Sequence, residues 1–240
     1  MQLTGHTRVN SFLKSLMVVL ACCSWALAAQ PTIESIWAET DVTLDTNPAS
    51  VFWRAAVPVY MESDAHGNPV PNYRTEVRTR WTKQNLYFLF ICPYEQLNLK
   101  PNPHTSTETN QLWNWDVAEV FIGTNFENIH LYKEFEMSPQ GEWVDLDIDS
   151  AHMGNEKAWL WNSGFEVKAR IDADKKIWYG EMRIPIKSLD DRPAAAGIEM
   201  RINLYRCQGA GPNRKYIAWQ PTHTRTFHTP EAFGRLRMAE

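Results

Sequence analysis

The sequence QLWNWDVAEVFIG, residues 111–123, decides the fold. Its bulky apolar and β-branched residues favour a β-strand, and Gly123 opens the turn that ends it. Side chains alternate between the two faces of a strand, so Ala118, Val120 and Ile122 share one wholly apolar face. We predict that this face points into the core of a β-sheet.

The opposite face of the same strand has a different chemistry. By the same alternation it presents Trp113, Trp115 and Glu119, together with Val117 and Phe121. Two indole rings and a carboxylate suit a sugar, because C–H faces stack on aromatic rings and hydroxyls bind charged groups. The alternatives are core packing at the strand edge for the tryptophans and a surface ion pair for Glu119.

The rest of the chain has the pattern of short strands. About eight to ten segments with strand-favouring composition are separated by turn signals, and no helical run of normal length occurs. Residues 85–94 are almost wholly apolar and predict a central strand, whereas 144–149 alternate strictly. The sequence therefore predicts an all-β, antiparallel sandwich that forms one domain over residues 30–240.

The first 29 residues differ from this domain. Arg8 and Lys14 give a positive start, an apolar run follows, and Ala26–Ala28 supplies small residues for cleavage. This pattern predicts a secretory signal peptide over residues 1–29 and a secreted or periplasmic protein. The run is short for a membrane span, and no other stretch is long and apolar enough to be one. Lipidation at Cys22 and a retained membrane anchor are the alternatives.

Composition excludes one class of partner. The 240 residues carry a net charge of −4 with 24 Lys and Arg, and no basic run marks a nucleic-acid surface. The eleven tryptophans exceed what core filling alone explains. Cys92 and Cys207 follow the leader, and they form either a disulfide or two separate buried thiols. The sequence does not indicate a protein partner.

Several motifs resemble one family. The sequence WNWDVAEVFI at 113–122 resembles the W-x-x-D-x-x-E-[VI]-F-[IV] strand of family-nine carbohydrate-binding modules and of related DOMON-like sandwich domains. WYGEMRIP at 178–185 resembles their W-x-x-E-x-x-[IV]-P strand. Residues 203–206, 218–219 and 230–236 supply further landmarks in the family's order, so the resemblance covers nearly all of the chain after the leader.

The resemblance implies non-catalytic binding of a carbohydrate chain end between two tryptophans, in a role linked to polysaccharide breakdown. Trp113 matches the first tryptophan, and Glu119 matches a carboxylate that binds hydroxyls. The second aromatic wall is Trp219 or, counted back from Phe233–Gly234, Phe227 or His228.

Other positions join the candidate site less directly. Lys133 lies near a basic position that is usually Arg, and Arg and Lys are not equivalent at a bidentate site. Glu134 and Glu136 are expected on a solvated strand face, where they could extend the binding surface. Arg206 is either a cation of the binding face or a buried partner of a carboxylate such as Glu181. The candidate carbohydrate-binding residues are thus Trp113, Trp115, Glu119, Lys133, Glu136, Arg206, Trp219 and Phe227.

A candidate metal site lies on one predicted strand. Asp145, Asp147 and Asp149 share a face, where like charges repel unless something relieves them. A structural calcium ion, which the resemblance also implies, would bind such oxygen ligands. A plain solvated face is the alternative.

Two other functions stay open. Glu119, Glu134 and Glu136 could supply the two carboxylates of a glycosidase, although the sequence has no nucleophile motif, phosphate loop or metal-ligand set. Some DOMON-like domains bind haem b for electron transfer through Met with His or Lys. The candidates here are Met137, Met182, Met200 and Lys133, with core filling as the alternative for the methionines.

Overall fold

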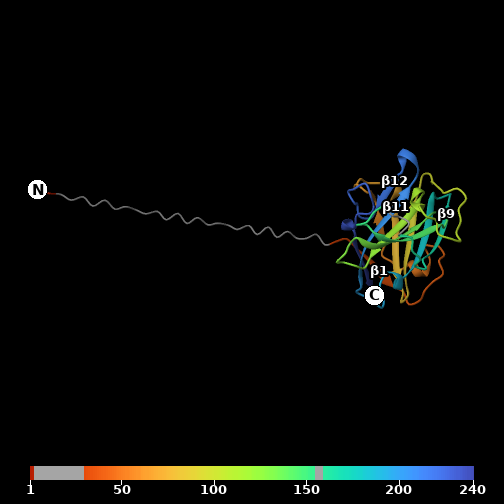
Figure 1. Cartoon of the computed structure of the whole chain (residues 1–240), viewed down its shortest axis with the longest axis horizontal. Coiled ribbons are helices and arrows are strands. Elements are labelled where there is room, and N and C mark those ends of the chain that lie inside the picture. The colour runs from red at the N-terminus through yellow and green to blue at the C-terminus, as the bar shows by residue number, and fades with distance from the viewer. Residues whose placement is uncertain (3–29, 155–158) are drawn as a thin grey trace.

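The computed structural model describes residues 1–2, 30–154 and 159–240 (Figure 1). The predicted signal peptide falls on residues 3–29 and so lies outside the described residues. In the described part the chain forms strands joined by short 3-10 turns, without an α-helix, and none of its helical turns is long and apolar enough to span a membrane. The strands are β1 (Thr32–Trp37), β2 (Val59–Met61), β3 (Ser63–Asp64), β4 (Thr75–Trp81), β5 (Asn85–Pro93), β6 (Val117–Gly123), β7 (Leu131–Met137), β8 (Trp143–Asp149), β9 (Glu166–Asp172), β10 (Ile177–Pro185), β11 (Glu199–Gln208), β12 (Lys215–Ala218) and β13 (Gly234–Ala239).

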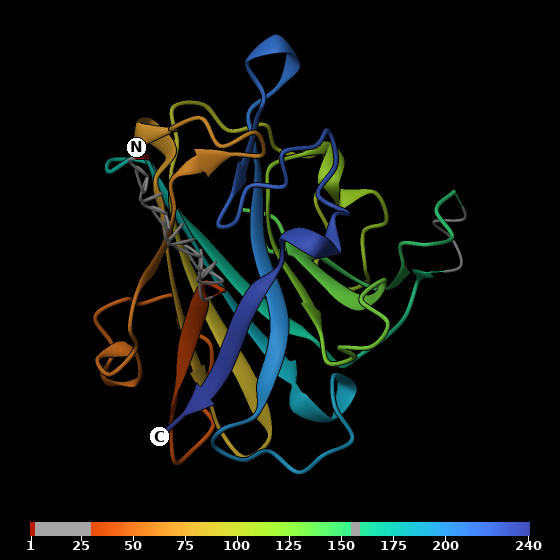
Figure 2. The ribbon, with the colours of Figure 1, turned by 90° about the vertical axis from the view of Figure 1, so that its left-hand side faces the viewer.

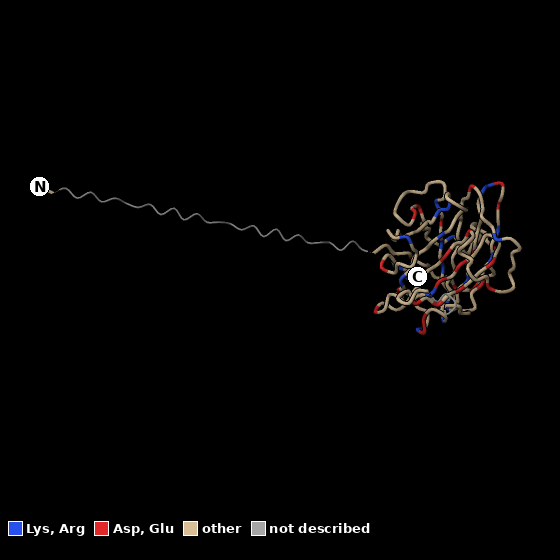
Figure 3. Tube along the Cα trace, turned by 45° about the horizontal axis from the view of Figure 1, so that its top comes forward, with Lys and Arg blue, Asp and Glu red and all other residues tan. Residues whose placement is uncertain are grey.

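The strands form one strongly curved sheet. Hydrogen bonds connect them in the order β8-β7-β6-β11-β13-β1-β4-β5-β10-β9, with β12, β3 and β2 attached at the side. The pairs β1–β13 and β1–β4 are parallel, and the other pairs are antiparallel. The sheet bends around its core in a nearly closed, barrel-like shape (Figure 2). The predicted all-β class is confirmed. Acidic and basic residues are interspersed along the chain (Figure 3).

The inner face of this sheet encloses the main core. Ala118, Val120 and Ile122 of β6 pack there with Phe88 and Trp178, all fully buried. The predicted inward face of β6 is therefore confirmed. Burial of so much apolar surface is the main force that holds the curved sheet together.

The outer face of β6 differs from the prediction in two ways. The strand begins at Val117, and Leu112–Asn114 forms a 3-10 turn (η3), so strand alternation does not place Trp113 and Trp115. The face is also covered: Val117, Glu119 and Phe121 expose 2% or less of their surface. Residues 220–233 cross over this face, and Phe233 of that segment packs on Phe121. The outer face is thus the lining of a covered site.

The two cysteines after the leader lie in separate clusters. Cys92 is buried in the inner core, Cys207 is buried under the outer covering segment, and both are free thiols. The open choice between a disulfide and two thiols is settled in favour of two thiols.

Replacing Gly234 by alanine is expected to destabilise the fold by about 1–3 kcal/mol, because a Cβ there overpacks a closed junction. The added carbon would lie 2.5 Å from the backbone oxygen of Pro31 and 2.7 Å from the Trp219 ring, and the backbone cannot yield cheaply. Urea denaturation measures the change. Gly197→Ala shows the cost of backbone strain without crowding, since Gly197 has a φ of +89° and its Cβ meets nothing within 4 Å. An unchanged free energy of unfolding in Gly234→Ala would contradict the packing explanation.

Candidate functional site

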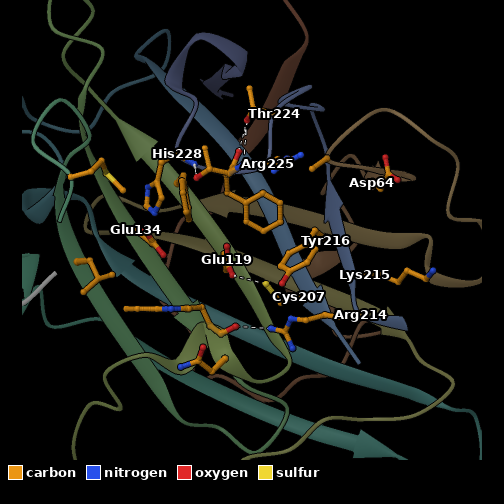
Figure 4. Close-up of a pocket in the computed structure, with 18 of the residues that line it drawn as sticks. Asp64, Glu119, Glu134, Cys207, Arg214, Lys215, Tyr216, Thr224, Arg225 and His228 are labelled. Atoms are coloured by element: carbon orange, nitrogen blue, oxygen red, sulfur yellow. Dashed lines mark hydrogen bonds between the residues drawn. The ribbon is translucent and has the colours of Figure 1, made fainter. Parts of the chain in front are cut away.

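A cavity of about 690 Å³ lies on the outer face of β6 and β11. Glu119 and Cys207 form part of its floor, and Tyr216 and His228 lie on its sides (Figure 4). The covering segment contributes Thr224 to His228, and the loop before β6 contributes Trp113. An enclosed space with mixed apolar and polar lining is the usual form of a small-molecule site.

The Trp113 wall is held from below by an arginine. Arg214 donates hydrogen bonds from Nη2 to the carbonyl oxygens of Trp113 and Trp115, at 2.6 and 2.8 Å. Its Nη1 donates to the carbonyl oxygen of Gly209 at 2.8 Å. The guanidinium therefore fixes the turn that presents the Trp113 ring with three of its five N–H donors, and it also lines the cavity.

The Phe227 wall is built on a buried tyrosine. The Phe227 ring stacks on Tyr205 with 4.1 Å between centroids and 13° between planes, and Tyr216 packs edge-on against it. The Tyr205 hydroxyl donates to the carbonyl oxygen of Phe227 at 3.1 Å and accepts from Asn203 Nδ2 at 2.7 Å. The ring and the backbone of Phe227 are therefore both fixed against the sheet.

His228 completes the apolar part of the lining. Its ring lies near Phe121 and Trp159, and its Nδ1 is 2.7 Å from the hydroxyl of Tyr132. Burial lowers the pKa of His228 to about 4. The imidazole is consequently neutral at physiological pH and acts as a hydrogen-bonding aromatic group.

Three carboxyl groups lie together here, and two of them, Glu119 and Glu134, line the cavity floor. Glu119 on β6 pairs across the strands with Glu136 on β7, and Glu134 lies two residues along the same face. Their exposures are 2%, 0% and 4%, so the predicted solvated face for Glu134 and Glu136 is wrong. The strand alternation was right, but the covering segment removes the water.

The burial of these carboxyl groups favours their protonated forms. Burial raises the pKa of Glu134 to about 7. Burial and the adjacent Glu134 carboxyl raise the pKa of Glu119 well above its usual range. Burial, with Glu119 and Glu134 nearby, does the same for Glu136. A protonated carboxyl can both donate and accept a hydrogen bond, which suits a ligand rich in hydroxyls.

Of the eight predicted carbohydrate-binding residues, the structure brings three together. Trp113, Glu119 and Phe227 line the cavity, and Phe227 is the one of the three candidate second walls that stacks on the sheet there. His228, the third candidate, lines it as well. Trp115, Lys133, Glu136, Arg206 and Trp219 do not line it.

Strand alternation explains two of these placements. Lys133 alternates with Tyr132 and Glu134, so it points to the other face, where it pairs with Asp147 at 2.6 Å and lies over the Trp161 ring. Arg206 pairs across the strands with Ala118 and so belongs to the inner face.

Arg206 has a structural environment. It is fully buried and donates to Thr75 Oγ1, the Pro93 carbonyl oxygen and Gln208 Oε1. The suggested partner Glu181 instead accepts from the backbone N–H groups of Asp45 and Thr46. Arg206 is therefore a buried structural residue, as one of its two alternatives predicts, but its partners are Thr75, Pro93 and Gln208 instead of Glu181. Trp219 packs against the inner core.

The three aspartates proposed for calcium each have their own partner. Asp145 accepts from the Ser163 N–H at 2.7 Å, Asp147 pairs with Lys133, and Asp149 pairs with His152. Among the described residues no group of three His, Cys, Asp or Glu side chains is placed to hold a metal ion. Calcium binding stays a prediction that this geometry does not favour.

The methionines proposed for haem ligation do not fit that group. Met137, Met182 and Met200 are fully buried in the inner core. The Met137 Cε would lie only 2.0 Å from a Cβ at Gly180, so the space beside it is filled. These residues fill the core, as their alternative explanation predicts.

Sequence reasoning missed several lining residues. Arg214, Tyr216 and Trp159 lie in or next to loops that carry no periodic pattern, and Glu134 was expected in solvent. Only the alternation of β7 gave a usable signal, because it places Glu134 on the same face as Tyr132.

An all-β domain with an aromatic, carboxyl-floored cavity on the outer face of its sheet belongs to the class of small-ligand-binding β-modules. Residues 44–240 match the family described as carbohydrate family 9 binding domain-like, and the chain belongs to this family. A search of curated proteins finds no significant match.

Solved structures share this fold at low sequence identity. A protein from Bacteroides uniformis ATCC 8492, for which carbohydrate binding is proposed, has a TM-score of 0.66 and 12% identity over 88% of this chain and 100% of its own. A family 9 carbohydrate-binding module from Caldicellulosiruptor kristjanssonii in complex with cellotriose has a TM-score of 0.62 and 13% identity over 87% of this chain and 94% of its own. The structure of a family 9 module from the same organism in complex with glucose has a TM-score of 0.61 and 12% identity over 85% of this chain and 95% of its own.

Proposed function

We propose that this chain binds carbohydrate without catalysis in the cavity between Trp113 and the covering segment. The observation that carries the proposal is the combination of fixed aromatic rings, Trp113 and Phe227, with the carboxyl group of Glu119 in one enclosed space. Rings of this kind stack on the C–H face of a sugar, and buried carboxyl groups bind its hydroxyls.

The carboxyl groups argue for binding over glycoside hydrolysis. A glycosidase needs one protonated carboxyl and one ionised carboxylate that flank the scissile bond. Burial raises the pKa of Glu119, Glu134 and Glu136, and the value of about 7 for Glu134 leaves a mixture of its protonated and ionised forms at neutral pH. Among the described residues no cation lies within 4.0 Å of these groups to hold one of them fully ionised, so we assign all three to hydrogen bonding.

The family membership and the fold support the same function. The matched family is a carbohydrate-binding one, and the Caldicellulosiruptor kristjanssonii module shares the fold in complex with cellotriose and glucose. The leader predicted from residues 1–29 favours action outside the cytoplasm, where polysaccharides are broken down. We infer an oligosaccharide or polysaccharide end as the ligand.

Replacing Trp113 by alanine is expected to weaken sugar binding by about 2 kcal/mol, roughly 30-fold, because the variant loses an aromatic anchor in an enclosed site. Titration calorimetry with glucose, cellotriose and a panel of other oligosaccharides measures the effect. Trp115→Ala is the matched control, since Trp115 lies in the same loop but outside the cavity lining. Its affinity is expected to stay within about threefold of the unmodified chain. The proposal fails if no sugar binds the unmodified chain, or if both variants lose the same affinity.

A further inference from the structure

Glu134 presents to the cavity an acceptor oxygen that the described chain does not use. Its side chain lines the cavity and is 4% exposed, and apart from the neighbouring Glu136 carboxyl its Oε2 has no hydrogen-bond partner in the described structure. Buried carboxyl oxygens are almost always partnered, because an unmade hydrogen bond is costly there. An unpartnered oxygen beside a cavity therefore points to a group that the ligand brings.

No cation of the described chain serves Glu119, Glu134 or Glu136. None of the three lies within 4.0 Å of a Lys, Arg or His nitrogen among the described residues. Arg214 is the cation whose charge acts on Glu119 and Glu136, but three of its five N–H groups donate to backbone carbonyls and none forms an ion pair with these carboxyl groups. The acidic floor is thus left without a paired positive charge.

The other groups facing this floor do not supply that charge either. Tyr132 on β7 and Tyr205 and Cys207 on β11 all have a raised pKa, chiefly through burial, and stay uncharged. His228 of the covering segment is neutral. The remaining charged lining residues are Asp64, which is acidic, and the cations Lys215 and Arg225. Neither cation forms an ion pair within 4.0 Å of the three carboxyl groups.

The walls are suited to a positive charge. Five aromatic rings line the cavity, those of Trp113, Phe121, Trp159, Tyr216 and Phe227. The electron-rich face of an aromatic ring attracts an ammonium group, most strongly where water is excluded. A metal ion fits less well, since no three potential ligand side chains converge among the described residues.

We propose that the cavity selects a sugar that carries a protonated amino group, a hexosamine unit, with the ammonium group against Glu134 and Glu119. This inference rests on the proposed carbohydrate binding. An ammonium group has three donors, one of which fits the unpartnered Oε2 of Glu134. Its charge makes the ionised carboxylate the favoured form in the complex, so a carboxyl proton passes to the buffer when the sugar binds.

Titration calorimetry of the chain at about pH 6, where a sugar amine is protonated, compares glucosamine with glucose and N-acetylglucosamine. Glucosamine is expected to bind at least about tenfold more tightly than either, because charge-assisted hydrogen bonds are the stronger ones. Repeating the titration in buffers of different ionisation enthalpy should show proton release with glucosamine and none with glucose.

Glu134→Gln keeps the shape and removes the charge, and it is expected to bring the affinities for glucosamine and glucose within about twofold of each other. Glu127→Gln, on an exposed turn, is the matched control and should keep the preference. If the Glu134 variant fails to fold, the unmodified chain still tests the inference, because proton release with glucosamine but not with glucose supports it and equal proton release contradicts it. Equal affinities for the three sugars, or a preference that survives Glu134→Gln, overturn this inference alone. Binding of no sugar overturns the proposed function as well.

Discussion

The free energy of unfolding is expected to fall as the pH rises from about 5 to about 8, by up to about 1.4 kcal/mol per pH unit for each buried carboxyl that titrates. Burial raises the pKa of Glu134 from 4.5 to about 7, and burial with neighbouring carboxyls raises the pKa values of Glu119 and Glu136 well above their usual range. Between the unfolded and folded pKa values the folded chain binds more protons than the unfolded chain. Rising pH therefore favours unfolding. The stabilisation is fully present below the pKa of the unfolded chain, and it is lost as the pH rises through the pKa of the folded chain.

Urea denaturation followed by tryptophan fluorescence at several pH values measures this dependence. The triple variant Glu119→Gln, Glu134→Gln and Glu136→Gln should lose most of the slope, because its amides do not titrate. Glu62→Gln, Glu76→Gln and Glu127→Gln together provide a control with the same charge change at less buried positions. A stability that is constant or rises over this range in the unmodified chain would contradict the protonated floor.

The fold could be predicted because local chemistry determines it. Alternation in residues 117–123 and the apolar run at 85–93 report directly which side chains meet in the core. The closure of the sheet could not be predicted from the same signals. The parallel pairing of β1 with β13 joins the two ends of the domain, and neither strand carries a signal that names its partner.

The site was predicted in part for the same reason. Glu119 and Trp113 belong to a recognisable motif, so their place in the site could be proposed from sequence. The burial of Glu134 and Glu136 depends on irregular segments distant in sequence, since η3 packs on β7 and residues 224–228 line the cavity with Glu134. The choice of Phe227 over Trp219 also depends on the path of the covering segment. Arg206 is a different case, since its pairing with Ala118 makes it an inner-face residue that alternation could have identified.

Asp116 belongs to the motif at 113–122, and the sequence alone assigned no role to it. The structure gives it a structural one. It is 1% exposed, its Oδ1 accepts from the Gly209 N–H at 2.6 Å, and its Oδ2 accepts from the Asn98 N–H at 3.0 Å. The same Oδ2 accepts from Gln208 Nε2 at 2.9 Å, and Gln208 in turn accepts from Arg206. One carboxylate therefore joins the loop after β5, the end of β11 and the turn that carries Trp113.

Replacing Asp116 by alanine is expected to lower the free energy of unfolding by about 3–5 kcal/mol, because two buried backbone N–H groups and one amide lose their acceptor. Urea denaturation at neutral pH measures the loss. The variant should also bind sugar more weakly, since the turn that presents Trp113 loses its anchor. Asp116→Asn should recover only part of the stability, because its amide turns a donor toward one of the N–H groups it must accept from.

The control for this prediction is Asp147→Ala. Asp147 is an aspartate of a neighbouring strand, but it is exposed and forms a surface ion pair with Lys133. Exposed pairs contribute about 1 kcal/mol or less, so this variant should stay close to the unmodified chain. If Asp116→Ala loses no more than Asp147→Ala, then the three segments are held by their own packing. The aspartate of the motif would in that case need an explanation in ligand binding instead.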